Sequence, residues 1–194
     1  LFLPTDSVMN VYYAEQGKSS YLDFDTTFLK ELALNHLIPF EISTGDFGLG
    51  AIREKNFLGD YIVTEFDGSD IILNKNSRII NQNEQAANGV IHIIDKVLAP
   101  KTKSVYEVLK EDPSYSLFTE GLEVTGIADT LNTIEFLYSE NMARTRFTVL
   151  AVADTTFNRF GITNIDQMIA QFTSAPDRIT YIENGFYRFI EYHC

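Results

Sequence analysis

The chain has 194 residues, of which 45% are hydrophobic and 13% aromatic, enough to build one or two folded domains. Its formal net charge is −12, and the acidity is spread evenly: residues 1–100 carry 14 acidic and 7 basic side chains, and residues 101–194 carry 13 and 8. Nucleic acid and anionic lipid are therefore disfavoured as partners, because both are bound by clustered lysine and arginine. No apolar run approaches the ~20 residues of a membrane span, so we expect no membrane insertion by this chain. The single cysteine, Cys194, excludes an intramolecular disulfide.

The first segment, LFLPTDSVMNVY, is a short apolar run followed by Asp6 and then by an apolar residue, Met9, three positions on. Thr5 and Asp6 are residue types that cap helix N-termini, so we expect a buried strand that turns into a helix. Further along, Asp23 and Asp25 allow two interpretations, calcium binding or helix capping. Their spacing lacks the glycine and the distal glutamate of a calcium loop, so we expect capping.

Between residues 57 and 98 the pattern changes to short β-rich runs separated by Asp-Gly, Asn-rich and Asn-Gly turns, which predicts antiparallel hairpins. The last run, NGVIHIIDKVLAP, is apolar on both faces of the expected strand, so we expect burial on both sides. His92 lies in its middle, and a buried imidazole must be hydrogen-bonded. We expect a structural histidine rather than a metal ligand, because zinc needs three or four convergent ligands and the chain has three histidines and one cysteine.

Residues 101–147 show a mainly helical pattern. Asp112-Pro113 is typical of an N-cap followed by proline at the first helical position. Gly126 is placed where a helix would end.

Part of the first segment recurs later in the chain. VLAVADTTFNRF, from Val149, matches LFLPTDSVMNVY, so that Asp154 corresponds to Asp6. Further on, His193 in YRFIEYHC corresponds to His36 in ELALNHLIP. The aspartate and the histidine are 30 residues apart in the first copy and 39 in the second. We assign the additional residues to TSAPDRITYIENG, which is rich in turn formers.

These motifs carry a family resemblance. NGVIHIIDKVLAP closely resembles the closing motif of the fasciclin (FAS1) domain family, and LFLPTDSVM resembles the strand-to-helix motif of that family. FTVLAVADTTF resembles the strand-to-helix motif less closely, since Val152 and Ala153 stand where proline and threonine are usual. Tyr192-His193 matches a Tyr-His pair of the family, whereas Asn35 stands before the histidine of the first copy. The residues that carry the structural motifs are Pro4, Thr5, Asp6, Asn88, Gly89, His92, Asp95, Pro100 and Asp154.

The resemblance implies an α+β fold, a fasciclin-like (FAS1) β-wedge or sandwich with packed helices. It also implies two units: residues 1–100 as a unit lacking its N-terminal helices, and residues 101–194 as a second unit lacking its C-terminal strands. Either residues outside this chain complete each unit, or residues 105–125 cover the strands of 57–98 in a permuted arrangement. Tandem domains normally fold separately, so we favour the first and expect residues 105–125 to pack on residues 147–172.

The helix-end histidines have two interpretations. Each could anchor its helix to the rest of the domain and interact with the C-terminal dipole. Alternatively, the resemblance implies a binding role, because the Tyr-His segment is implicated in receptor binding at the cell surface in some family members. Asn35, His36, Tyr192 and His193 therefore form a candidate interaction segment. A thiol nucleophile at Cys194 beside His193 is disfavoured, because adjacent residues rarely face each other.

By its resemblance, the chain is expected to be a non-enzymatic adhesion or interaction module that binds protein or glycan. We expect it to act extracellularly, at the cell surface or in the periplasm, without a cofactor or metal. The alternative is a glycan- or small-molecule-capturing accessory protein of a bacterial surface uptake system, which strong saccharide binding would favour. A hydrolase is disfavoured, because no nucleophile–base pair is evident.

Overall fold

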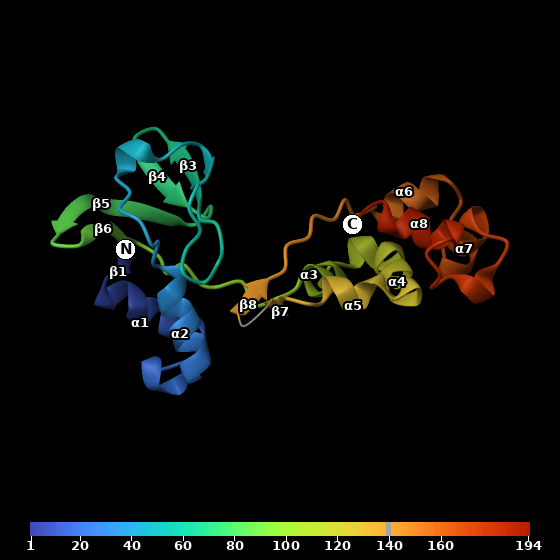
Figure 1. The fold of residues 1–194 in the computed structure, drawn as a ribbon, viewed down its shortest axis with the longest axis horizontal. Helices are drawn as coiled ribbons and strands as arrows, with labels where there is room; N and C mark the ends of the chain where they lie inside the picture. The colour runs from blue at the N-terminus through green and yellow to red at the C-terminus, as the bar shows by residue number, and fades with distance from the viewer. Residues whose placement is uncertain (139–140) are drawn as a thin grey trace. The chain divides into compact units, whose positions relative to one another are not determined.

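The computed structural model describes residues 1–138 and 141–194 and divides the chain into two compact units, Leu1–Lys101 and Thr102–Cys194 (Figure 1). We call them unit 1 and unit 2. Unit 1 combines a sheet with two helices, and the described part of unit 2 is mainly helical. No helix in these described ranges has the length and apolar character that a membrane span requires.

The strands of unit 1 form one six-stranded mixed sheet in the order β1-β6-β5-β4-β3-β2. Only the pair of β1 with β6 is parallel. This confirms the predicted α+β class and the antiparallel hairpins. The strands are β1 (Phe2–Pro4), β2 (Gly50–Ala51), β3 (Val63–Asp67), β4 (Asp70–Leu73), β5 (Ser77–Ala86) and β6 (Gly89–Ile94).

Turn residues set the hairpins of this sheet. Gly68, with φ +60°, lies between β3 and β4, and Asn74 and Lys75, with φ of 49° and 64°, lie between β4 and β5. Left-handed backbone of this kind favours glycine and asparagine. The β5–β6 turn is formed by residues 87 and 88, and Gly89 already pairs with Ala86 as the first residue of β6.

The N-terminal strand leads into helix α1 (Asp6–Glu15), and a second helix, α2 (Thr26–Asn35), follows after the 3₁₀ turn η1 (Tyr21–Asp23). Thr5 caps α1, its Oγ1 accepting from the N–H of Val8 at 3.4 Å, and Asp25 caps α2, its Oδ1 accepting from the N–H of Thr27 at 2.8 Å. Both predicted N-caps are confirmed. Between α2 and β3 lies the 3₁₀ turn η2 (Thr44–Asp46).

Unit 1 buries apolar side chains in two clusters. One holds the inner residues of the sheet with Phe2, and the other joins α1 and α2 through Tyr12, Leu32 and Val97. In β6 the alternate residues Val90, His92 and Ile94 are buried, whereas Ile91 and Ile93 are half-buried. The expectation that both faces are buried was therefore wrong, because the sheet covers its core on one face only.

Unit 2 packs its helices around one core. Phe118, Leu122, Met168, Phe186 and Ile190 are fully buried there. Helix α4 thus shares a core with the segment 147–168, and the sheet clusters of unit 1 contain none of its residues. The helices and 3₁₀ turns are α3 (Val105–Glu111), η3 (Pro113–Tyr115), α4 (Ser116–Thr125), α5 (Ile127–Leu131), α6 (Asp154–Arg159), α7 (Ile165–Phe172), η4 (Pro176–Arg178) and α8 (Gly185–Glu191).

Two parts of unit 2 differ from the sequence-based expectation. Helix stops at Leu131, and a two-stranded hairpin follows, β7 (Glu135–Tyr138) with β8 (Asn141–Arg144), inside the interval expected to be mainly helical. The residues before Asp154 were expected to form a strand, as β1 does. They belong to no strand, because no described residue of unit 2 offers them the partner that β6 offers β1.

Candidate functional site

The two copies of the predicted repeat have the same geometry where the strand segment meets the helix-end histidine. The N–H of Phe2 donates to the carbonyl of His36 at 3.0 Å, and the N–H of Leu150 donates to the carbonyl of His193 at 2.8 Å. Each imidazole also turns back on its own helix: Nδ1 lies 2.7 Å from the carbonyl of Leu32 in unit 1 and 2.8 Å from that of Phe189 in unit 2.

His36 is buried and uses both ring nitrogens. The N–H of Leu98 donates to Nε2 at 3.0 Å, so Nε2 is unprotonated and Nδ1 carries the proton that it donates to Leu32. The ring is therefore neutral, with a defined tautomer. Burial lowers the pKa of His36, which keeps the ring neutral near pH 7.

The residue before this histidine, Asn35, is buried too, at 4% exposure. Its Nδ2 donates to the carbonyl of Leu98 at 2.7 Å, and its Oδ1 accepts from Nδ2 of Asn56 at 2.7 Å. Asn56 in turn accepts from the N–H of Asp60 at 2.8 Å. Sequence reasoning missed Asn56, which lies in a loop without any distinctive motif.

His92 occupies the middle of β6 and is also fully hydrogen-bonded. The N–H of Asn83 donates to Nδ1 at 3.3 Å, and Nε2 lies 2.9 Å from the carbonyl of Ile42. The ring packs against Phe2 and Phe47, with centroids 5.5 and 5.6 Å away. This geometry ties β6 to β5 and to the loop before β2.

We predict that His92→Ala lowers the free energy of unfolding of unit 1 by about 1–3 kcal/mol, because the Ile42 carbonyl loses its buried donor. Hydrogen exchange, measured by mass spectrometry on peptides from each unit, would report the change in unit 1 separately. A variant with wild-type protection of unit 1 but without partner binding would reverse the assignment of His92 as structural.

Unit 1 is also expected to lose stability as the pH falls below about 6.5, the usual pKa of histidine. Burial lowers the pKa of His36 and of His92, so the unfolded chain takes up protons at a higher pH than the folded unit does. Each histidine then contributes a slope of at most about 1.4 kcal/mol per pH unit between its folded and unfolded pKa. Asp23 and Asp25 do not add to this loss above pH 5. Hydrogen bonds from backbone N–H groups lower the pKa of both carboxyl groups, so both remain charged at that pH.

Urea unfolding followed by hydrogen exchange at pH 7.5, 6 and 5 would measure this loss, with the peptides of unit 2 as an internal reference. A midpoint for unit 1 that rises on acidification would contradict the neutral assignment of both rings.

The corresponding residues of unit 2 are much more exposed. Tyr192 is 87% exposed, where its counterpart Asn35 is buried, and His193 is half-buried. Around the His193 ring lie Phe189, 5.0 Å away between centroids, and Phe118, 5.8 Å away. Its Nε2 has no hydrogen-bonding partner among the residues that the structure describes. Of the candidate interaction segment, only these unit 2 residues offer surface to a partner.

The remaining motif residues make local contacts within each unit. Asp6 lies in the first turn of α1, and Asp95 accepts from the N–H of Arg78 at 2.7 Å. Pro4 is half-buried at the end of β1, and Pro100 is buried. In unit 2, Asp154 joins α6 to α4, because its carboxylate accepts from the N–H of Leu117 at 3.0 Å and from Oγ of Ser116 at 2.5 Å. Asn88 is the second residue of the β5–β6 turn, and Gly89 is the first residue of β6.

No catalytic pair forms at the end of α8. The thiol of Cys194 is directed at the carbonyl of Ile190, 3.5 Å away, rather than at the neighbouring imidazole. Partial burial, together with the Glu191 carboxylate, raises the pKa of the thiol, which disfavours the thiolate. Within the described residues, no group of three or more histidine, cysteine, aspartate or glutamate side chains could hold a metal.

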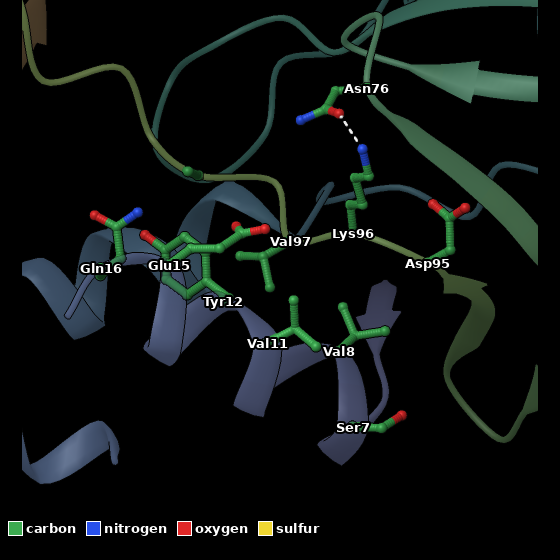
Figure 2. A pocket seen from close by; sticks show the side chains of 11 residues that line it. Ser7, Val8, Val11, Tyr12, Glu15, Gln16, Asn76, Asp95, Lys96 and Val97 are labelled. Carbon is green, nitrogen blue, oxygen red and sulfur yellow. Dashed lines mark hydrogen bonds between the residues drawn. The ribbon is translucent and has the colours of Figure 1, made fainter. Parts of the chain in front are cut away.

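Unit 1 has an open hollow beside α1, and unit 2 has one beside α6, the helix at the matching place of the repeat. In unit 1, a pocket of about 420 Å³ lies between α1 and residues 95–97. Figure 2 shows the side chain of Val97 close to Tyr12 and Val11, while Lys96 turns away to Asn76. In unit 2, a groove of about 400 Å³ is lined mostly by apolar side chains, including Phe157, Phe160, Phe172 and Phe189. Sequence reasoning missed both hollows.

Comparison with known proteins gives the family. The profile of the fasciclin domain matches residues 1–100. Human periostin is 28% identical over 110 residues, a match that covers 57% of this chain and 13% of periostin. A solved FAS1 domain pair from the insect cell adhesion molecule Fasciclin I matches 100% of this chain and 62% of its own, with a TM-score of 0.40 and 17% identity. The chain therefore spans only part of the proteins that it resembles. The family match extends over the closing motif and the strand-to-helix motif that the structure pairs through β1 and β6, and the chain belongs to the fasciclin domain family.

Proposed function

We propose that this chain is a non-enzymatic interaction module that acts outside the cytoplasm, at a cell surface or in an extracellular matrix, and binds a protein or a glycan. The observation that carries the proposal is the exposed apolar surface at the C-terminal end of α8. Tyr192 is 87% exposed, Leu150 69% and Phe160 78%. The hydrogen bond from the N–H of Leu150 to the carbonyl of His193 holds Leu150 at the end of α8, where His193 follows Tyr192 in the chain. Phe160 lines the groove beside Phe189 of α8. Exposed apolar side chains gathered around one helix end typically mark an interaction site, and tyrosine is enriched at such sites.

Family membership supports the same proposal. Fasciclin domains occur in cell adhesion proteins, of which insect Fasciclin I is one. We propose further that residues 1–100 and 101–194 correspond to two successive fasciclin-like units. Three observations support this division: the boundary after Lys101, the separate cores, and the shared geometry at His36 and His193.

The absence of enzymatic activity is also part of the proposal. It is supported by the engagement of both ring nitrogens of His36 and of His92 with backbone groups, and by the raised pKa of the Cys194 thiol. A histidine with two backbone partners has no free nitrogen with which to activate a nucleophile.

The test is attachment of cells, and binding of cell-surface extracts, to plates coated with the full chain. Tyr192→Ala is expected to reduce attachment at least about tenfold, because interface tyrosines commonly contribute 1.4 kcal/mol or more. Tyr181→Ala is the matched control: Tyr181 is 59% exposed but lies in the loop before α8. Equal loss in both variants, or none in either, would contradict the proposed site. A glycan array would distinguish a saccharide from a protein ligand, and an esterase and glycosidase screen would test for catalysis.

A further inference from the structure

The hollow beside α1 in unit 1 combines an apolar floor with acidic side chains at its rim (Figure 2). Its volume of about 420 Å³ lies within the usual range of protein ligand pockets, roughly 300–1,000 Å³. Tyr12 and Val97, at 8% and 9% exposure, form the floor, and Val11 beside them is 59% exposed. Glu15 and Asp95 line the same hollow, so a ligand on this floor would lie beside two carboxylates.

Neither carboxylate has a cationic partner within the part of the chain that the structure describes. Glu15 and Asp95 form no ion pair with any residue there. Lys96 also lines the hollow, but its Nζ donates to Oδ1 of Asn76 at 2.9 Å, and Figure 2 shows it turned away from α1. Oδ1 of Asp95 accepts from the N–H of Arg78 at 2.7 Å, whereas its Oδ2 has no partner among the described residues. Both acidic groups are therefore available to a cation from a ligand.

The end of α1 favours a cation for a second reason. Glu15 is the last residue of this helix, where the helix dipole is negative and stabilises cations. The last turn of α1, which the structure describes completely, contains no basic residue. Burial, and then the charge of Glu15, raise the pKa of the Tyr12 hydroxyl, which places this carboxylate near the floor of the hollow. Residues 1–100 also carry 14 acidic and 7 basic side chains, so a basic partner would be attracted from a distance, by an amount that salt reduces.

The two acidic side chains lie toward opposite ends of α1. Figure 2 shows Asp95 on the side of Ser7 and Val8, in the first turn of the helix, and Glu15 at the other end. From Ser7 to Glu15 the helix axis runs about 12 Å, at 1.5 Å per residue. In an extended peptide, residues i and i+4 are about 13 Å apart, and residues i, i+2 and i+4 point to one face. Two basic side chains four positions apart therefore match the two carboxylates, and the side chain midway between them is placed over the floor.

We propose that this hollow binds an extended segment of a partner protein in which an apolar side chain has a basic side chain two positions before it and another two positions after it. The apolar side chain would lie on Tyr12 and Val97, one basic group would pair with Glu15, and the other with Oδ2 of Asp95. The inference goes beyond the proposed function, because it adds a binding surface in unit 1 to the one at the end of α8. A wholly apolar ligand fits less well, since it would displace water from both carboxylates and give neither of them a partner.

The experiment titrates the full chain with the acetylated and amidated peptide Gly-Arg-Ser-Leu-Ser-Arg-Gly and follows binding by NMR. We expect the amide signals of residues 7–16 and 95–99 to shift. The matched peptide Gly-Arg-Leu-Ser-Ser-Arg-Gly has the same composition and the same spacing of charges, but it places leucine on the opposite face of an extended chain. We expect it to bind at least about fivefold more weakly, because its leucine is not buried on the floor.

Variants of the chain test each contact separately. Glu15→Gln and Asp95→Asn are each expected to weaken binding about three- to fivefold at low salt, as the loss of an exposed ion pair does, and the asparagine oxygen can still accept from the N–H of Arg78. Val11→Ser is expected to weaken binding about fourfold, the effect of one buried methylene group. The matched control is Asp67→Asn, which removes an exposed carboxylate at the end of β3, outside the hollow, and is expected to leave binding unchanged.

Three results would overturn the inference. Equal binding of the two peptides would mean that charge alone is recognised. An equal loss in Asp67→Asn and Glu15→Gln would assign the attraction to the general acidity of the chain. Amide shifts confined to residues outside 7–16 and 95–99 would place the site elsewhere. Tyr192→Ala separates this inference from the proposed function: unchanged peptide binding in a variant that has lost cell attachment supports a second surface, and loss of peptide binding there contradicts one.

Discussion

Replacing His36 with alanine is expected to lower the free energy of unfolding of unit 1 by about 2–4 kcal/mol. The loss has two parts. The N–H of Leu98 and the carbonyl of Leu32 both lose a buried partner, and the ring, at 5% exposure, leaves a cavity. Because the Leu98 bond fixes the residues that follow β6, we expect hydrogen exchange to accelerate in residues 95–100 as well as in α2.

The matched control is His193→Ala in unit 2. This ring is half-buried, and Phe189 provides its only hydrogen-bonding partner among the described residues, so we expect a loss of less than about 1 kcal/mol. Measuring both variants by hydrogen exchange in the full chain separates the two units. Equal destabilisation by the two substitutions would contradict the distinction between an anchored and an open histidine.

The features that sequence predicted best are those that local chemistry decides. Asp25 caps α2, Asp112 precedes proline at the start of η3, and Gly126 ends α4 with φ +80°. Each of these residues acts on its near neighbours in the chain, by capping a helix or by ending it, so no knowledge of distant packing was needed. The antiparallel hairpins of unit 1 belong to the same class, since turn residues specify them.

The features that sequence missed depend on partners far along the chain. The segment at Val149 resembles β1 in sequence, yet only β1 is a strand, because a strand requires a neighbour and β6 provides one in unit 1 alone. The burial of Asn35 likewise depends on the carbonyl of Leu98, 63 positions away. The β7–β8 hairpin was missed because TIEFLYSENMARTRF shows no regular alternation of apolar and polar residues; the only signal for a strand is the cluster of β-branched and aromatic residues in TIEFLY.

The same dependence explains why the candidate site was only partly predicted. Repeat alignment placed His36 and His193 at matching positions, and the structure gives both rings the same bond to the carbonyl four residues earlier. Exposure, however, differs between the copies because of what covers each one. Alignment of the two repeat copies does not reveal this difference in exposure, because the difference depends on where β6 packs in unit 1.

A second large effect is expected from Gly185→Ala, which should destabilise unit 2 by about 3 kcal/mol or more. Gly185 is the first residue of α8, and an added methyl group there would overlap the backbone carbonyl of Phe172 at the end of α7. Backbone cannot rotate away as a side chain can, so the two helices must separate. The N-cap would be strained too, because Asn184 bonds the N–H of Phe186 on one side and Thr173 with Ala175 on the other.

Gly121→Ala is the control within the same core. There the added methyl group would meet the flexible end of Ile190, 2.7 Å away, which can adopt another rotamer. The gain in helix propensity also offsets part of the crowding, so we expect a loss of no more than about 2 kcal/mol. Hydrogen exchange in α8 measures both variants, and a smaller effect at Gly185 than at Gly121 would contradict the close contact of α7 with α8. Because α8 leads directly into Tyr192 and His193, separation of the helices should also weaken attachment in the cell assay.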